Sequence, residues 1–108
     1  MGESLERGSL TEAVFYILLS LYKPLHGYGI MKMVDEWSGG RVVLGAGTLY
    51  GALNTLMDKS WIEAFAGTDS RKKEYVITSL GREQLVDEVR RLEERLSNAR
   101  RVLGGDEG

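Results

Sequence analysis

The sequence predicts a mainly α-helical fold with a small β-hairpin wing: a winged helix-turn-helix followed by a long C-terminal helix. Three observations predict this fold. Apolar residues recur at helical spacing in three segments of residues 10–59, two strand-like runs follow, and a heptad pattern occupies the end of the chain. We expect a winged helix-turn-helix unit over residues 1–78, a separate long helix over 79–103 and a flexible tail over 104–108.

The first helix is predicted from about Leu10 to Tyr22, and Ser9 with Glu12 has the spacing of a capping box. Its apolar residues cover two faces. One face carries Leu10, Ala13, Val14, Ile17, Leu18 and Leu21, and the other carries Phe15, Leu19 and Tyr22. A helix that is apolar on two sides is normally buried on both. In so small a chain, the second face indicates a partner subunit.

Pro24 cannot continue that helix, so Lys23 to Gly27 is predicted to be a turn. A second helix, Gly27 to Ser38, would bury Ile30, Met33, Val34 and Trp37. The β-branched run "RVVL" at residues 41–44 predicts one short strand. A third helix, Ala46 to Lys59, places Leu49, Leu53 and Leu56 on one stripe with Met57 beside it.

The runs "WIEAF" and "KEYVIT" are separated by the turn-rich "AGTDSRK", which predicts a β-hairpin with a basic tip. Thr78 or Ser79 can cap the final helix, which would end near Leu103. Its apolar residues step by 4, 3, 4, 3 and 4 positions, which predicts a dimer interface made by Leu85, Val89, Leu92, Leu96, Ala99 and Leu103. Residues 87, 88, 90, 91 and 93–95 would form a solvated face, with Asp87 paired to Arg91.

Composition excludes several classes of protein. The chain has 108 residues, no cysteine and a net charge of −2, so disulfides and thiolate metal sites are absent and any binding of nucleic acid requires a local basic patch. The N-terminal "MGESLERGSL" lacks the apolar core of a secretion signal. The longest nearly apolar run, residues 13–22, is too short to span a membrane. We expect a cytoplasmic protein with no membrane partner.

Enzyme, nucleotide and metal sites are not predicted. The stretch "GAGTLYGALNTLMDKSWI" begins with glycines, but a dinucleotide-binding loop needs glycine where Tyr50 stands, and no Gly-Lys-Ser/Thr follows. His26 is the only histidine and is expected to be a turn residue rather than a catalyst or ligand. We therefore expect no catalytic residue, no metal and no cofactor.

Binding to double-stranded DNA accounts for more of the exposed residues than an enzyme, nucleotide or metal site does. With the leucine stripe of the third helix turned inward, the outward residues are small or form hydrogen bonds, as in a helix that reads the major groove: Thr48, Tyr50, Gly51, Asn54 and Thr55. The wing would contact phosphates through Arg71, Lys72 and Lys73, and Lys32 and Lys59 would add backbone contacts. Any single residue here is equally well explained as an ordinary solvated residue. The competing function is a winged-helix module that binds protein, which the neutral helix and acidic pI favour.

Three stretches resemble the PadR-like transcriptional regulators, in particular the short members with a single C-terminal helix: "LHGYGIMKMV", "GAGTLYGALNTLMDKSWIEAF" and "RKKEYVITSLGREQL". The resemblance extends from Ser9 to Leu103. Its most specific parts are His26-Gly27-Tyr28, Gly47-Thr48-Leu49-Tyr50 and Lys73-x-Tyr75-x-x-Thr78-x-x-Gly81. It implies a homodimeric winged-helix repressor. Such a repressor dimerises through its terminal helices and releases DNA when a small hydrophobic or phenolic effector binds.

Carried over to this chain, the resemblance puts Thr48 and Tyr50 on the recognition helix and residues 71–73 on the wing. The chain departs from the family at Gly51 (often proline), Asn54 and Thr55 (often basic) and Ser60 (often glycine). Leu92 stands where some drug-binding members have tryptophan. We expect an effector pocket lined by Phe15, Leu19, Tyr22 and Leu92, which would favour a flexible apolar ligand over a stacked planar one.

Overall fold

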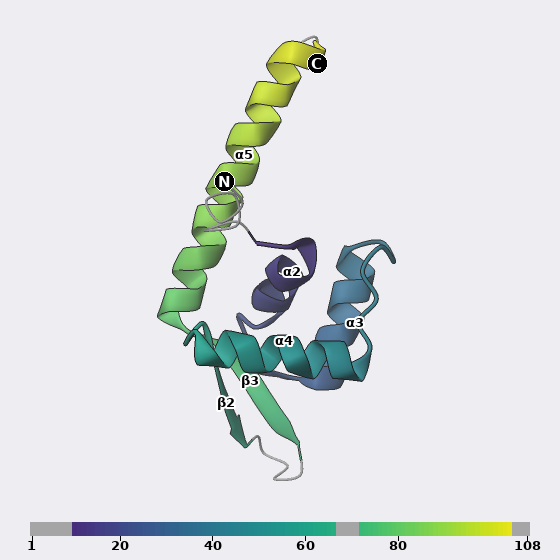
Figure 1. The fold of residues 1–108 in the computed structure, drawn as a ribbon, viewed down its shortest axis with the longest axis vertical. Helices are drawn as coiled ribbons and strands as arrows, with labels where there is room; N and C mark the ends of the chain where they lie inside the picture. The colour runs from purple at the N-terminus through teal and green to yellow at the C-terminus, as the bar shows by residue number, and fades with distance from the viewer. Residues whose placement is uncertain (1–9, 67–71, 105–108) are drawn as a thin grey trace.

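The computed structural model describes residues 10–66 and 72–104. In chain order, the elements are α2 (Glu12–Ser20), β1 (Leu25–His26), α3 (Gly27–Trp37), α4 (Ala46–Asp58), β2 (Ile62–Ala66), β3 (Lys73–Ile77) and α5 (Ser79–Leu103). Helices α2, α3 and α4 lie together with the hairpin on one side, and α5 extends well beyond them (Figure 1). This is the winged helix-turn-helix with a long C-terminal helix that the sequence predicts.

The core lies where the helical stripes and one face of the sheet meet. Helix α2 is at its centre and supplies Ile17, Leu18 and Leu21. The predicted stripe of α4 is fully confirmed, because Leu49, Leu53 and Leu56 are all buried. The other buried apolar residues come from α3, the sheet and the first part of α5, and they are Ile30, Val34, Ile62, Tyr75, Ile77 and Leu85.

The sheet has the strand order β1-β3-β2 and is antiparallel throughout. The predicted strand at residues 41–44 is wrong, since the third strand is Leu25–His26, within the segment expected to be a turn. It pairs with Tyr75 and Glu74 of β3. The 41–44 segment instead folds back on the end of α3, where the Val42 N–H donates to the Ser38 hydroxyl at 3.0 Å. With its backbone held there, it has no sheet edge to join.

The ends of two helices differ from the prediction. Helix α2 is capped by Thr11, whose hydroxyl accepts from the Val14 N–H at 3.1 Å, so the Ser9–Glu12 capping box is wrong; Ser9 itself lies outside the described residues. At the end of α3, Trp37 is 41% exposed and packs beside the Tyr16 ring. The adjacent Ser38 is buried instead, and its hydroxyl lies where it can donate to the Asp35 carbonyl at 3.2 Å or to the Val42 carbonyl at 3.4 Å.

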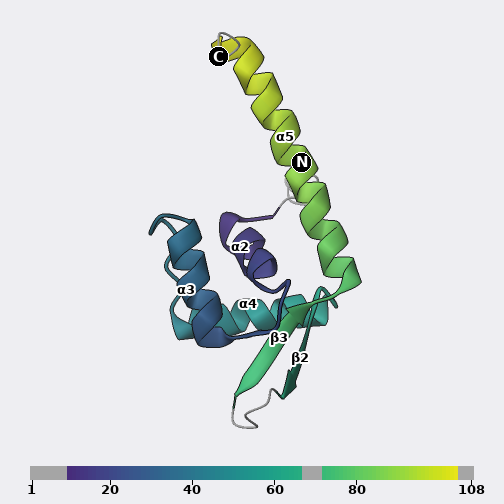
Figure 2. The ribbon, with the colours of Figure 1, turned by 180° about the vertical axis from the view of Figure 1, so that it is seen from behind.

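Helix α5 begins as predicted, with the Thr78 hydroxyl accepting from the Gly81 N–H. The predicted solvated face is wrong at Glu88, which is 3% exposed. Its carboxylate accepts from Arg91 at 2.8 Å and from the Leu10 N–H at 3.4 Å, because the chain that enters α2 crosses α5 there. Asp87 pairs with Arg90 rather than Arg91. Seen from behind, α5 passes α2 and then extends beyond the other described helices (Figure 2).

Candidate nucleic-acid interface

Helix α4 presents a polar face opposite its buried leucines. Gly45 caps its N-terminus without a side-chain hydrogen bond. All five residues predicted to read DNA are exposed, namely Thr48, Tyr50, Gly51, Asn54 and Thr55. The Thr55 hydroxyl donates to the Gly51 carbonyl within the helix at 3.2 Å. This face therefore carries uncharged groups that can form hydrogen bonds with base edges.

Tyr50 lies against the start of α3, where residue 27 is glycine. A Cβ atom at Gly27 would collide with the Tyr50 hydroxyl oxygen and lie 2.9 Å from its Cζ atom, closer than real Cβ atoms come. The glycine thus lets the tyrosine ring cross from α4 to α3. The sequence motif His26-Gly27-Tyr28 therefore has a packing role that sequence reasoning did not assign.

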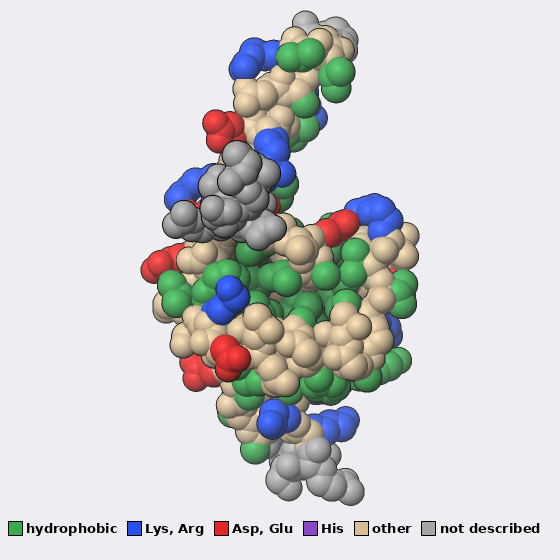
Figure 3. All heavy atoms as spheres, viewed as in Figure 1, with side chains coloured by type: hydrophobic (Ala, Val, Ile, Leu, Met, Phe, Trp, Pro, Cys, Tyr) green, Lys and Arg blue, Asp and Glu red, His purple; other side chains and the backbone are tan. Residues whose placement is uncertain are grey.

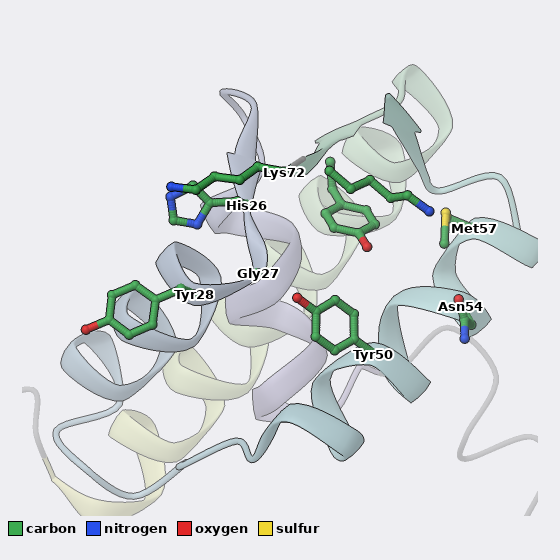
Figure 4. Close-up of a pocket in the computed structure, with 9 residues that line it drawn as sticks. His26, Gly27, Tyr28, Tyr50, Asn54, Met57 and Lys72 are labelled. Carbon is green, nitrogen blue, oxygen red and sulfur yellow. The ribbon is translucent and has the colours of Figure 1, made fainter. Parts of the chain in front are cut away.

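A groove of about 670 Å³ opens between the start of α3, the exposed face of α4 and the wing. Its lining residues are His26, Gly27, Tyr28, Tyr50, Asn54, Met57, Lys72, Lys73 and Tyr75 (Figure 4). Of these described lining residues, two are lysines and none is acidic. Burial, and secondarily the neighbouring Tyr50, raises the pKa of Tyr75 above its ordinary value, so its hydroxyl stays protonated and neutral. The groove offers hydrogen-bond donors and positive charge, which suits a phosphate strand.

His26 and Tyr28 are the residues that sequence reasoning missed. His26 is not simply a turn residue: it ends β1 and caps α3, with its Nδ1 atom accepting from the Gly29 N–H at 3.2 Å. Its ring stacks with the Tyr28 ring at a centroid distance of 6.5 Å and an interplanar angle of 21°. The available signal was the capping position, because histidine stands where a helix begins after proline.

Several predicted contacts lie away from the groove. The Lys59 ammonium lies 5.1 Å from the centre of the Trp61 ring, at the C-terminal end of α4. Lys32 is exposed on α3 and does not line the groove, and neither do Thr48, Gly51 and Thr55. Arg71 lies outside the described residues. Among the described residues, Lys72 and Lys73 are thus the wing cations that the structure brings next to α4.

A second pocket, of about 330 Å³, lies between the start of α2 and the middle of α5. It is lined by Leu10, Glu12, Phe15, Tyr16, Glu88, Leu92 and Arg95. Two of the four residues predicted for an effector pocket, Phe15 and Leu92, therefore come together. The other two do not, because Leu19 lies outside this pocket and the Tyr22 ring is covered by the Arg82 guanidinium at 4.6 Å.

The row of α5 predicted to form a dimer interface divides into two parts. Leu85 is 2% exposed and belongs to the core of the single chain, so it has almost no surface left for a partner. Beyond it, Val89, Leu92, Leu96 and Leu103 are 38–81% exposed, and Ala99 is exposed as well. Apolar side chains are visible along this free part of the helix in Figure 3.

Within residues 10–66 and 72–104, no group of three histidine, cysteine or acidic residues could hold a metal ion. Over the same residues, no helix is both long enough and apolar enough to cross a membrane.

Comparison with known proteins gives the same fold. A PadR-like transcriptional regulator from Bacillus cereus superposes with a TM-score of 0.69 at 21% identity, over 93% of this chain and 96% of that one. RosR from H. salinarum superposes with a TM-score of 0.66 at 25% identity, over 90% and 93% of the two chains.

A protein of transposon TN4556 from Streptomyces fradiae, described as an uncharacterized 37.1 kDa protein, is 39% identical over 66 residues. The match covers 61% of this chain but only 18% of that protein. A family model matches residues 15–87, from α2 into α5. Because this is more than half of the sequence, the chain belongs to the transcriptional regulator PadR-like family.

Proposed function

We propose that the chain is a sequence-specific DNA-binding transcriptional regulator that reads the major groove with α4. The observation that carries this proposal is the polar face of α4 beside a groove whose described lining residues include two lysines and no carboxylate. Family membership supports it, since the family is one of transcriptional regulators rather than enzymes. The face has the hydrogen-bonding groups for base edges, and the wing has the charge for phosphates.

The distribution of charge indicates that α4 and the wing would contribute to DNA binding in different ways. No Lys or Arg lies within α4 itself, so the attraction to phosphate would come from the wing, while α4 would discriminate between sequences. Each phosphate neutralised by a lysine releases counterions, so binding should weaken as salt rises. A contact between uncharged groups lacks this dependence.

A salt-dependent gel shift tests the function, with a duplex from the chain's own upstream region and a random duplex of equal length. Lys72→Ala should weaken binding to both duplexes and reduce the slope of log K against log salt by about one. Tyr50→Ala should weaken only the specific complex, by about 1–3 kcal/mol. Lys59→Ala is the matched control, because this lysine lies over Trp61 and away from the groove. Absence of binding to either duplex at low salt would contradict the proposal and favour the protein-binding module.

We infer further that the regulator is a homodimer joined through α5. A helix of 25 residues is about 37 Å long, and its outer half carries an exposed apolar row. Among the described residues, Leu85 is the member of this row that the chain itself buries, and a second copy of the helix could cover the surface that the others leave exposed. Leu92→Glu should therefore give monomers in sedimentation, whereas Glu94→Lys, on the opposite side of the helix, should leave the dimer intact. An unchanged Leu92→Glu dimer would exclude this interface.

We also propose that the regulator is a repressor released by an effector bound in the pocket between α2 and α5. Phe15, Tyr16 and Leu92 give this pocket apolar walls, and it joins the DNA-reading unit to the proposed dimer helix. A ligand that prefers one arrangement of the two units would shift the equilibrium of DNA binding. Leu92 supplies no flat ring, so we expect flexible apolar ligands to bind better than planar ones.

Fluorescence can test the effector, because the Trp37 ring centre lies 5.9 Å from that of Tyr16 in the pocket wall. Trp61 lies elsewhere, beneath Lys59, so a Trp61→Phe variant isolates the reporter and a Trp37→Phe variant is the control. Aliphatic compounds should change Trp37 emission and lower the affinity for DNA. Tight binding of planar dyes alone would contradict the preference for flexible ligands, and no binding at all would exclude the pocket.

A further inference from the structure

The edge of the groove formed by β1, beside the wing strand β3, carries a hydrogen-bond donor that the proposed reading of DNA leaves unused. His26 and Tyr28 line this edge where β1 passes into α3 (Figure 4). The Lys72 side chain reaches toward His26 in the same view. The groove therefore brings one imidazole and one ammonium to the same part of its rim.

The orientation of the imidazole follows from its role as a helix cap. The Gly29 N–H donates to Nδ1 of His26 at 3.2 Å, so Nδ1 acts as an acceptor and carries no proton. In the neutral ring the proton is then on Nε2, on the other side of the imidazole from the cap. The Tyr28 ring lies nearly parallel to the imidazole, with the two ring centres 6.5 Å apart. Helix capping thus leaves a donor of defined position on the rim.

We propose that His26 is a further DNA contact, with its Nε2–H donating to a phosphate of the strand that Lys72 neutralises. This rests on the proposed function, and it assigns the β1–α3 junction as the second support for the sugar-phosphate backbone. Tyr28 is a positioning residue in this arrangement. Its own hydroxyl points away from the groove in Figure 4, so its contribution is the ring.

A variant that keeps the cap but removes the donor tests the proposal. His26→Asn retains an N-cap side chain, since asparagine is among the best capping residues, but its shorter amide does not reach the position of Nε2. We expect about tenfold weaker binding, measured by fluorescence anisotropy, to specific and random duplexes alike. The salt slope should stay at the parent value, because a neutral donor releases no counterion. Lys72→Ala, in contrast, should reduce that slope by about one.

Tyr28 variants keep the test independent of the cap. Tyr28 is 68% exposed, so its replacement leaves the core intact. Tyr28→Phe keeps the stacked ring and should bind like the parent, whereas Tyr28→Ala should lose several-fold in affinity. Parental affinity of both His26→Asn and Tyr28→Ala, together with a weakened Lys72→Ala, would overturn the assignment of His26 while leaving the proposed function standing. A parent chain that binds no duplex would overturn both.

The shared phosphate can be tested directly with duplexes that carry single methylphosphonate substitutions. If His26 and Lys72 hold one phosphate, then neutralising that phosphate should remove most of the effect of either variant. Additive losses at every position would show that the two side chains do not meet on the same group.

Discussion

Gly81 should be the least replaceable glycine among the described helices. The substitution Gly81→Ala tests the physical reason, which is a close contact with a neighbouring backbone. Gly81 lies in the first turn of α5, where the helix crosses the backbone of Trp61. A Cβ atom at this position would collide with the Trp61 carbonyl oxygen and lie 2.8 Å from Cγ1 of Ile77. The carbonyl cannot easily yield, because it accepts from the Thr78 N–H at 2.9 Å. The Thr78 hydroxyl also donates to the Ser60 carbonyl at 2.7 Å.

The clash must therefore be relieved by moving the start of α5, which weakens both hydrogen bonds and the packing of Leu85. Two hydrogen bonds contribute about 1 kcal/mol each, and loosened packing adds about 1–2 kcal/mol. Alanine regains about 1 kcal/mol of helix propensity over glycine. Gly81→Ala should thus lower the free energy of unfolding by about 2–3 kcal/mol.

Urea unfolding followed by far-UV circular dichroism measures this change, at one protein concentration for all variants because a dimer's stability depends on concentration. Gly51→Ala is the matched control. It is also a glycine within a helix, but a Cβ atom there meets nothing within 4 Å, so alanine should raise stability by up to about 1 kcal/mol. Equal stability of the two alanine variants would refute the close-contact argument.

Three further predictions concern stability. Ser60 has a φ of +64°, a left-handed conformation that costs a non-glycine residue about 1–2 kcal/mol. Ser60→Gly should therefore raise the free energy of unfolding by about 0.5–1 kcal/mol, once the entropy cost of glycine is subtracted. A lower stability of this variant in urea unfolding would contradict the prediction. Burial raises the pKa of Tyr75 in the folded state, so the folded chain holds this proton more tightly than the unfolded chain does. Stability should therefore fall as pH rises above about 10, and Tyr75→Phe should reduce that alkaline loss in thermal melts. An unchanged alkaline loss in Tyr75→Phe would contradict this assignment. Glu88→Ala removes the acceptor of the Leu10 N–H and of Arg91, so it should lower the free energy of unfolding in urea by about 1–3 kcal/mol. Asp87 is an exposed partner of Arg90, so Asp87→Ala should change that free energy by no more than about 0.5 kcal/mol. Equal effects of these two substitutions would show that Glu88 gains nothing from burial.

The sequence by itself determined the features whose signals are local. The stripe at positions 49, 53 and 56 predicts α4, because helical periodicity is a property of one segment. Likewise, turn residues between two strand-like runs predict the hairpin, and Thr78 marks the start of α5. The exposed polar face of α4 follows from the same periodicity. Local spacing was therefore sufficient for these elements and for the part of the candidate site that lies on one helix.

Only the tertiary structure decided features that depend on what lies opposite a segment. Residues 41–44 have the composition of a strand but meet no free edge, whereas Leu25–His26 meets one on β3, about fifty residues away in the chain. Glu88 has the pattern of a solvated residue but is buried because residue 10 crosses it. The groove arises in the same way, as the sheet and α4 bring His26, Tyr50 and Lys72 together from three separate segments. Burial and proximity are properties of pairs of segments, so periodicity within one segment carries no record of them.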